Sequence, residues 1–334
     1  MNGPAAADGL IVVDKPGGMT SHDVVARIRR LARTRRVGHG GTLDPMATGV
    51  LVIGVGRATR LLTYVIGAGK SYTATIRLGQ STVTDDAEGE VVTTSPTGDV
   101  SDEAIHAGLA ALTGEIDQVP SAVSAIKIDG QRAYKRVRDG EAVALAARRV
   151  TVSRLDPLAV RRLDIPPDPG GSAGPGGSAD PGELAGPGGP VAPAGTGEGG
   201  LAVVDVDVAV DCSSGTYIRA LARDLGAALG VGGHLTALRR TAVGGFTLAE
   251  AVTLPELEER APWVVDLTVD AAARRFFPER GASADEVTVL SHGGPLDPAG
   301  IAGPYAVVDS TGKVIAIVSE RDGRARAEIV LAPA

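Results

Sequence analysis

The chain has 334 residues, one cysteine (Cys212) and a formal net charge of −7. This length is sufficient for a large core and for two domains, and a single cysteine excludes an internal disulfide framework. No apolar run approaches the roughly 20 residues that cross a bilayer, and the start of the chain lacks a signal-peptide pattern, so we expect a cytoplasmic protein without a membrane partner.

The first predicted elements are a buried strand over 10–13, a turn over 14–18 and a helix that begins near Thr20 or Ser21. Apolar residues recur along this helix at i, i+4 and i+7, which predicts one buried face. The arginines of this region lie mostly outside that apolar face. They are Arg27, Arg30, Arg33, Arg35 and Arg36. A basic face can serve solubility alone, but this one leads into the loop described next, so we favour contact with RNA phosphates despite the acidic net charge.

Residues 37–51 form the most distinctive stretch, with glycines at high density around an Asp44-Pro45 step. Glycine lets the backbone bend sharply or approach a ligand closely, and Asp-Pro favours a turn. A carboxylate on such a loop, followed by an apolar run, is a candidate reactive group. The alternative is that Asp44 only caps a turn.

After this loop the pattern predicts a strand over 50–55, a short helix over 58–65 and a strand over 72–78 with Tyr72 on its apolar face. Residues 67–71 end in Gly-Lys-Ser, as a nucleotide-binding phosphate loop does. The first glycine of that motif is missing and a strand follows instead of a helix, so we reject a phosphate loop here. The acidic turn over 82–89 lacks the spacing of a calcium loop and is predicted to connect a hairpin. Ser101 is expected to cap a helix with Ile105 and Leu109 on one side.

The second half begins with a segment over 165–200 in which 8 of 36 residues are Pro and 13 are Gly, and which we expect to be a disordered insertion. Beyond it, 202–210 alternates as a strand with Asp205 and Asp207 on its polar face, and a helix follows to Leu229. The end of the chain predicts a small β-barrel of short apolar strands. These runs are Val287–Leu290, Tyr305–Val308, Val314–Val318 and Ala327–Leu331.

The stretch GHGGTLDPMATGVL over 38–51 resembles the catalytic loop of the TruB family of tRNA pseudouridine synthases, GHTGTLDPLATGVL, with Gly40 and Met46 as the two differences. Further stretches resemble family motifs in the same order. They are DKPxGMTS at 14–21, Lys-x-Tyr at 70–72, TDTxDAxG at 82–89, QxPSxxSAxK at 118–127, CSxGTYIR at 212–219 and HxxxLRRT at 234–241.

This resemblance implies isomerisation of uridine 55 in the T-loop of tRNA to pseudouridine, with neither cofactor nor metal. It gives Asp44 as the catalytic carboxylate and Arg219 as the arginine that pairs with it, which would lower the pKa of Asp44. The remaining roles implied are Tyr72 stacking on the uracil and helping to move the C5 proton, Tyr217 and Leu238 shaping the uracil pocket, and His39 filling the space left by the flipped base. Apart from the resemblance, Lys127 and the basic cluster that begins at Arg132 are further candidate contacts with the RNA backbone.

The expected fold is α+β, with a mixed and mainly antiparallel sheet. We predict a catalytic domain over 1–250, a connecting segment over 251–273 and a PUA-like domain over 274–334, whose acidic balance puts strong RNA contact in doubt. The expected partner is the tRNA T-arm, and a monomer is expected. Two alternatives remain: a guide-dependent synthase acting on rRNA, and a non-catalytic RNA-binding or RNA-folding protein, which the joint presence of Asp44, Tyr72 and Arg219 disfavours.

Overall fold

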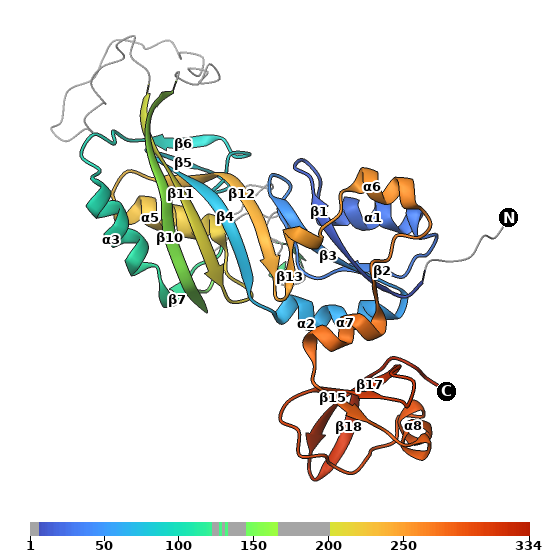
Figure 1. Cartoon of the computed structure of the whole chain (residues 1–334). Helices are drawn as coiled ribbons and strands as arrows, with labels where there is room; N and C mark the ends of the chain where they lie inside the picture. The colour runs from blue at the N-terminus through green and yellow to red at the C-terminus, as the bar shows by residue number, and fades with distance from the viewer. Residues whose placement is uncertain (1–6, 122–126, 129–130, 133–144, 166–200) are drawn as a thin grey trace, which may run out of the picture.

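In the computed structural model, the larger part of the chain is built on one ten-stranded sheet (Figure 1). The structure describes residues 7–121, 127–128, 131–132, 145–165 and 201–334, and the statements below concern these. The strands along the main path of the sheet are β14 (Leu267–Thr268), β1 (Gly9–Lys15), β3 (Thr48–Val55), β12 (Gly233–Val243), β4 (Lys70–Leu78), β11 (Leu201–Cys212), β10 (Arg148–Ile165) and β7 (Gly114–Gln118). Two short strands, β2 (Val37–His39) and β13 (Phe246–Thr247), pair with β3 and β12.

Within the described strands, β3 and β12 form the parallel pair of this sheet, and the other neighbours are antiparallel, which confirms the mixed, mainly antiparallel α+β prediction. The parallel contact places Gly49 of β3 opposite Arg240 of β12. Gly49 has φ +100°, and a Cβ there would lie 2.2 Å from the Arg240 carbonyl oxygen, so this approach requires glycine. The loop that carries Asp44 runs directly into β3, and the parallel contact therefore sets that loop beside β12.

The strand patterns read from the sequence match the buried faces. Tyr72 and Ile76 of β4 and alternate valines of β11 are buried in one cluster. Asp205 lies on the face opposite these valines, as the alternation predicted, and its side chain is buried there. β11 lies between β4 and β10, and Asp205 is opposite Arg77, which donates two hydrogen bonds of 2.8 Å to its carboxylate.

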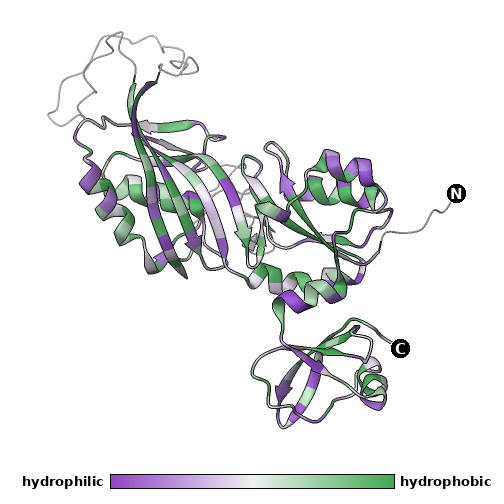
Figure 2. Ribbon diagram, viewed as in Figure 1, coloured by the Kyte–Doolittle hydropathy of each residue, from purple (hydrophilic) through white to green (hydrophobic). Residues whose placement is uncertain are grey.

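Helices pack on both faces of the sheet, with more of them on one face than on the other. α1, α3, α5 and α6 share a hydrophobic cluster with one face, whereas α2 and α7 cover the opposite face beside β1 and β3. Figure 2 shows both hydrophilic and hydrophobic residues on α1 and α6, as expected of helices with one side buried. The helices of this part are α1 (Ser21–Leu31), α2 (Leu62–Gly67), α3 (Asp102–Ala111), α5 (Ile218–Ala228), α6 (Leu254–Arg260) and α7 (Val269–Phe276), with 3₁₀ turns η1 (Gly56–Leu61) and η2 (Leu248–Glu250).

Local capping explains where two of these helices begin. Thr20 accepts a hydrogen bond from the Asp23 amide, and the Asp23 side chain bonds back to Thr20, so a capping box starts α1. Ser101 caps α3 through the Ala104 amide, as the sequence predicted. The acidic turn over 82–89 connects a hairpin of β5 (Gln80–Thr82) and β6 (Val91–Thr94), also as predicted.

The C-terminal part is a separate four-stranded sheet that packs below α2 and α7 in Figure 1. Its elements are β15 (Glu279–Gly281), α8 (Ala284–Ser291), β16 (Tyr305–Val308), β17 (Val314–Arg321) and β18 (Arg324–Val330). The prediction of a strand over Val287–Leu290 was wrong, because this run lies in α8. A capping box of Ser283 and Glu286 starts that helix and outweighs the strand preference of the two valines.

Two predicted regions lie partly outside the described residues. Of the 165–200 segment, the described structure includes Ile165, the last residue of β10. Lys127 and Arg132 belong to the short paired strands β8 (Lys127–Ile128) and β9 (Gln131–Arg132), and their side chains are outside the description. Across the described ranges, none of the helices has the length and apolar character needed to cross a membrane.

Candidate active site

Asp44 and Arg219 are 175 positions apart in the sequence and form an ion pair in the fold. Asp44 lies on the loop between β2 and β3, and Arg219 is in the first turn of α5. The Arg219 Nε atom is 3.0 Å from Asp44 Oδ2, and Nη2 is 3.4 Å from Oδ1. The guanidinium is buried, whereas 35% of the Asp44 side chain remains exposed. The carboxylate is therefore both held in place and open to a ligand.

A second carboxylate, Asp86, fixes the other side of the same guanidinium. Arg219 Nη1 donates to Asp86 Oδ2 at 3.1 Å and to the Thr84 carbonyl at 2.8 Å. Asp86 is itself buried and accepts hydrogen bonds from the Thr84 hydroxyl and the Glu88 amide. Our sequence analysis treated Asp86 as part of a hairpin turn, and its place in the TDTxDAxG-like motif is the signal that could have identified it.

The pKa of Asp44 is raised, which contradicts the lowering expected from the sequence. Burial is the largest cause, the charge of Arg219 opposes it, and the charge of Asp86 adds to it. Because Arg219 also bonds Asp86, a single guanidinium is shared between two carboxylates. Its field therefore does not outweigh the loss of hydration at Asp44.

This raised pKa predicts an acid limit to activity. If the ionised Asp44 carboxylate reacts, the active fraction falls as the pH drops through a pKa above 3.8, the ordinary value. We expect kcat/KM to decline on acidification at a higher pH than an ordinary aspartate would require. A pH profile of kcat/KM, with circular dichroism to show that the protein stays folded, measures this, and a flat profile down to pH 4 contradicts it.

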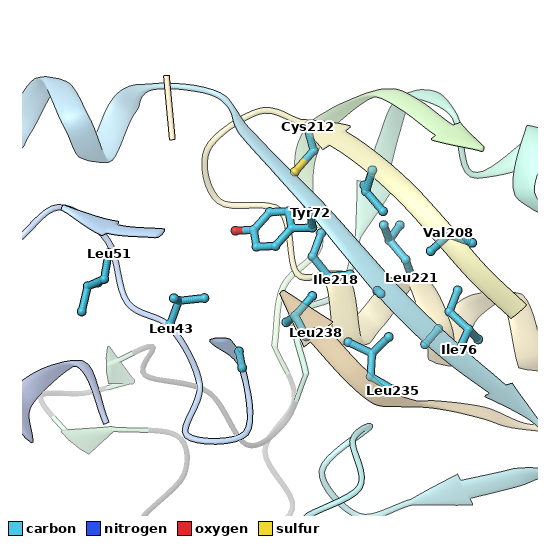
Figure 3. Close-up of a cluster of buried hydrophobic side chains, with 14 of the residues drawn as sticks. Leu43, Leu51, Tyr72, Ile76, Val208, Cys212, Ile218, Leu221, Leu235 and Leu238 are labelled. Carbon is cyan, nitrogen blue, oxygen red and sulfur yellow. The ribbon is translucent and has the colours of Figure 1, made fainter. Parts of the chain in front are cut away.

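Asp44 and Arg219 line a pocket of about 490 Å³. Tyr72, Tyr217 and Leu238 line it too, so the structure brings together five of the residues singled out in the sequence. Figure 3 shows Tyr72 beside Leu238 and Ile218, with its hydroxyl directed away from Val208 and Ile76, on the side of the loop that carries Leu43. The complete lining is Gly41, Thr42, Leu43, Asp44, Ile66, Lys70, Tyr72, Ser214, Gly215, Thr216, Tyr217, Ile218, Arg219, Leu238 and Arg240.

Arg240, which our sequence analysis did not single out as a site residue, ties the Asp44 loop to the sheet. Its buried guanidinium donates to the carbonyls of Val50 (2.8 Å), Thr42 (3.1 Å) and Gly41 (3.2 Å), and Arg240 lies opposite Tyr72 in the pairing of β12 with β4. One side chain therefore fixes the loop just before Asp44 relative to Tyr72. No periodic pattern in a sequence reports such a contact.

Two further polar side chains hold the walls of the site. Gln118 accepts from the Tyr217 amide (2.8 Å) and donates to the Tyr217 carbonyl (3.1 Å). Lys15 is fully buried, and its ammonium donates to the carbonyls of Pro16, Met19 and Pro45. Burial lowers the pKa of Lys15 to about 8, while the charge of Asp44 counters that shift. Lys15 thus holds Pro45, the residue next to Asp44, through the Pro45 carbonyl oxygen.

His39 and the candidate arginines in and just after α1 lie outside the pocket lining. The His39 ring packs edge to face against His22, with centroids 5.3 Å apart, and burial lowers its pKa. Arg27 is paired with Glu258. The four other candidate arginines of residues 27–36 are exposed: Arg30, Arg33, Arg35 and Arg36.

Three family models match the chain. Residues 29–166 match the N-terminal domain of TruB family pseudouridylate synthases, 219–273 match the C-terminal domain of tRNA pseudouridylate synthase B, and 277–332 match the C-terminal part of tRNA pseudouridine synthase II.

Whole-chain relatives agree with these matches. The tRNA pseudouridine synthase B of Mycobacteroides abscessus is 53% identical and covers 100% of this chain and 99% of its own, and that of Nocardia farcinica is 54% identical and covers 97% and 94%. Among solved structures, a chain of a Cbf5-Nop10-Gar1 complex is 25% identical, with a TM-score of 0.63 over 97% of this chain and 85% of its own. The chain therefore belongs to the TruB family of pseudouridine synthases.

Proposed function

We propose that this protein isomerises uridine 55 in the T-loop of tRNA to pseudouridine without a cofactor. Membership of the family gives the general activity, pseudouridine synthesis, and the similar relatives are named as tRNA enzymes. The observation that carries the proposal is the Asp44 carboxylate, held by Arg219 and still open to a pocket of about 490 Å³.

The residues of this pocket suit the isomerisation. The C1′–N1 bond of the uridine breaks, the uracil turns and a C1′–C5 bond forms, while C5 loses a proton and N1 gains one, so no electrons or atoms are exchanged overall. Asp44 acts as the nucleophile at C1′ or at C6, and both routes begin from the ionised carboxylate that Arg219 stabilises. Tyr72 stacks on the uracil and assists removal of the C5 proton.

A base in the folded T-loop must leave its stack to reach such a pocket. We propose that His39, whose half-buried ring has a pKa lowered by burial, occupies the space that the flipped base leaves. The exposed arginines Arg30, Arg33, Arg35 and Arg36 would contact phosphates of the T-arm. We place this reaction in the cytoplasm, with one copy of the chain acting on one tRNA.

Incubation of the purified protein with an unmodified tRNA transcript, followed by mapping of pseudouridine, tests this function. We expect product at position 55 with the protein alone, and none when cytidine replaces that uridine. Product elsewhere in the tRNA would contradict the choice of position. A requirement for a guide RNA, or binding of tRNA without any product, would favour the guide-dependent or the non-catalytic alternative.

A further inference from the structure

Lys70 lies in the wall of the pocket that Asp44 faces. It lines the same pocket as Asp44, and none of the carboxylates in the described ranges lies within ion-pair distance of its ammonium. The ammonium donates to the carbonyls of Ile66 (2.8 Å) and Ala68 (2.7 Å), at the end of α2. An ammonium has three N–H donors, so one of them stays available to a ligand.

Arg240 makes this part of the pocket wall more positive. A Cβ built on Gly41 would lie 3.8 Å from Lys70 Cε and 3.9 Å from Arg240 Nη1, so both cationic side chains border the same glycine of the Asp44 loop. The Arg240 guanidinium is buried and bonds three carbonyls, so it adds charge without being free to reach a ligand. Burial, and then the charge of Arg240, lower the pKa of Lys70 to about 8.

The wall of the pocket therefore carries groups of opposite charge. Asp44 provides a carboxylate, and Lys70 and Arg240 provide positive charge that forms no ion pair with a carboxylate among the described residues. A flipped nucleotide carries a neutral uracil, and its sugar is flanked by negative phosphodiesters. When C1′ of that nucleotide faces Asp44, the flanking phosphodiesters are attached across the ribose, at C3′ and C5′, and Lys70 in the wall of the same pocket offers a charge that suits one of them.

We propose that Lys70 binds a phosphodiester that flanks the flipped uridine, and so holds the nucleotide in register with Asp44. This inference rests on the proposed function for the substrate class. It assigns Lys70 a role in binding the RNA backbone, separate from the chemical step at Asp44.

The salt dependence of tRNA binding tests this role. Each phosphate that a lysine neutralises contributes about 0.7 to 0.9 to the slope of log K against log salt concentration. We expect Lys70→Gln, which keeps a hydrogen-bond donor for the α2 carbonyls, to weaken binding of an unmodified tRNA transcript about tenfold at low salt. Its slope should fall by about 1. Lys70→Arg, which keeps the charge, should restore most of the affinity and the wild-type slope.

A matched control and a stability measurement separate binding from folding. Lys313 is exposed on a turn of the C-terminal sheet beside Asp309, and Lys313→Gln removes the same charge outside the pocket. We expect Lys313→Gln to keep the wild-type slope, and thermal melting to show that Lys70→Gln is folded. An unchanged slope for Lys70→Gln, or equal slopes for both Gln variants, would overturn the proposal. A wild type that binds tRNA without forming pseudouridine would refute the proposed function instead, while the slopes still test Lys70.

Discussion

Replacing Asp44 by Asn should abolish pseudouridine formation, with a loss on the order of 10³-fold or more in the single-turnover rate. The amide keeps the size of the side chain but loses the nucleophilic charge that faces the pocket. Arg219 remains bonded to Asp86 and to the Thr84 carbonyl, so its position should survive the change. Because 35% of the Asp44 side chain is exposed, we expect the free energy of unfolding to change by no more than about 1 kcal/mol.

The measurement is single-turnover conversion of a tRNA transcript, with binding followed separately. The Asp44→Asn variant should bind tRNA nearly as well as the wild type, because phosphates elsewhere supply most of the affinity. Asp44→Ala serves as a second variant that cannot regain a carboxylate by deamidation. Product formed at the wild-type rate by either variant would refute the catalytic role of Asp44.

Replacing Arg219 by Met should have the largest effect on stability. Asp86 has 3% of its side chain exposed, and without the guanidinium its charge would stay buried, with no other cationic partner in direct contact among the residues that the structure describes. Breaking a buried pair in this way costs about 3–5 kcal/mol, because the remaining charge is not hydrated. Urea unfolding should therefore show a much lower midpoint for Arg219→Met, and activity should be lost as well.

A double variant distinguishes this cause from loss of packing. Asp86→Asn removes the charge but leaves an oxygen that can still accept from Thr84 and Glu88. We expect Arg219→Met combined with Asp86→Asn to recover part of the stability lost in Arg219→Met alone, while remaining inactive. If the effects of the two substitutions on the free energy of unfolding simply add, the unpaired charge of Asp86 is not the cause of the stability lost in Arg219→Met.

The sequence was most informative where a local pattern has one structural meaning. Alternation in 72–78 predicted the buried face of β4, and Thr20 and Ser101 predicted two helix starts, because side-chain period and capping depend only on near neighbours. The family resemblance added Asp44 and Arg219, which the fold brings to 3.0 Å. The same kind of local reasoning failed for Val287–Leu290, where a capping box started a helix in a run that favours strands.

The long-range contacts of the site were decided by the tertiary structure. The sharing of Arg219 between Asp44 and Asp86, the three carbonyls held by Arg240 and the burial of Asp205 each join segments that are far apart in the chain. The direction of the Asp44 pKa shift depends on the same contacts, since it is the balance of burial against every neighbouring charge. A sequence pattern records which side of an element is buried, but burial and electrostatic energy depend on which groups meet across the fold, and only the packed chain determines that.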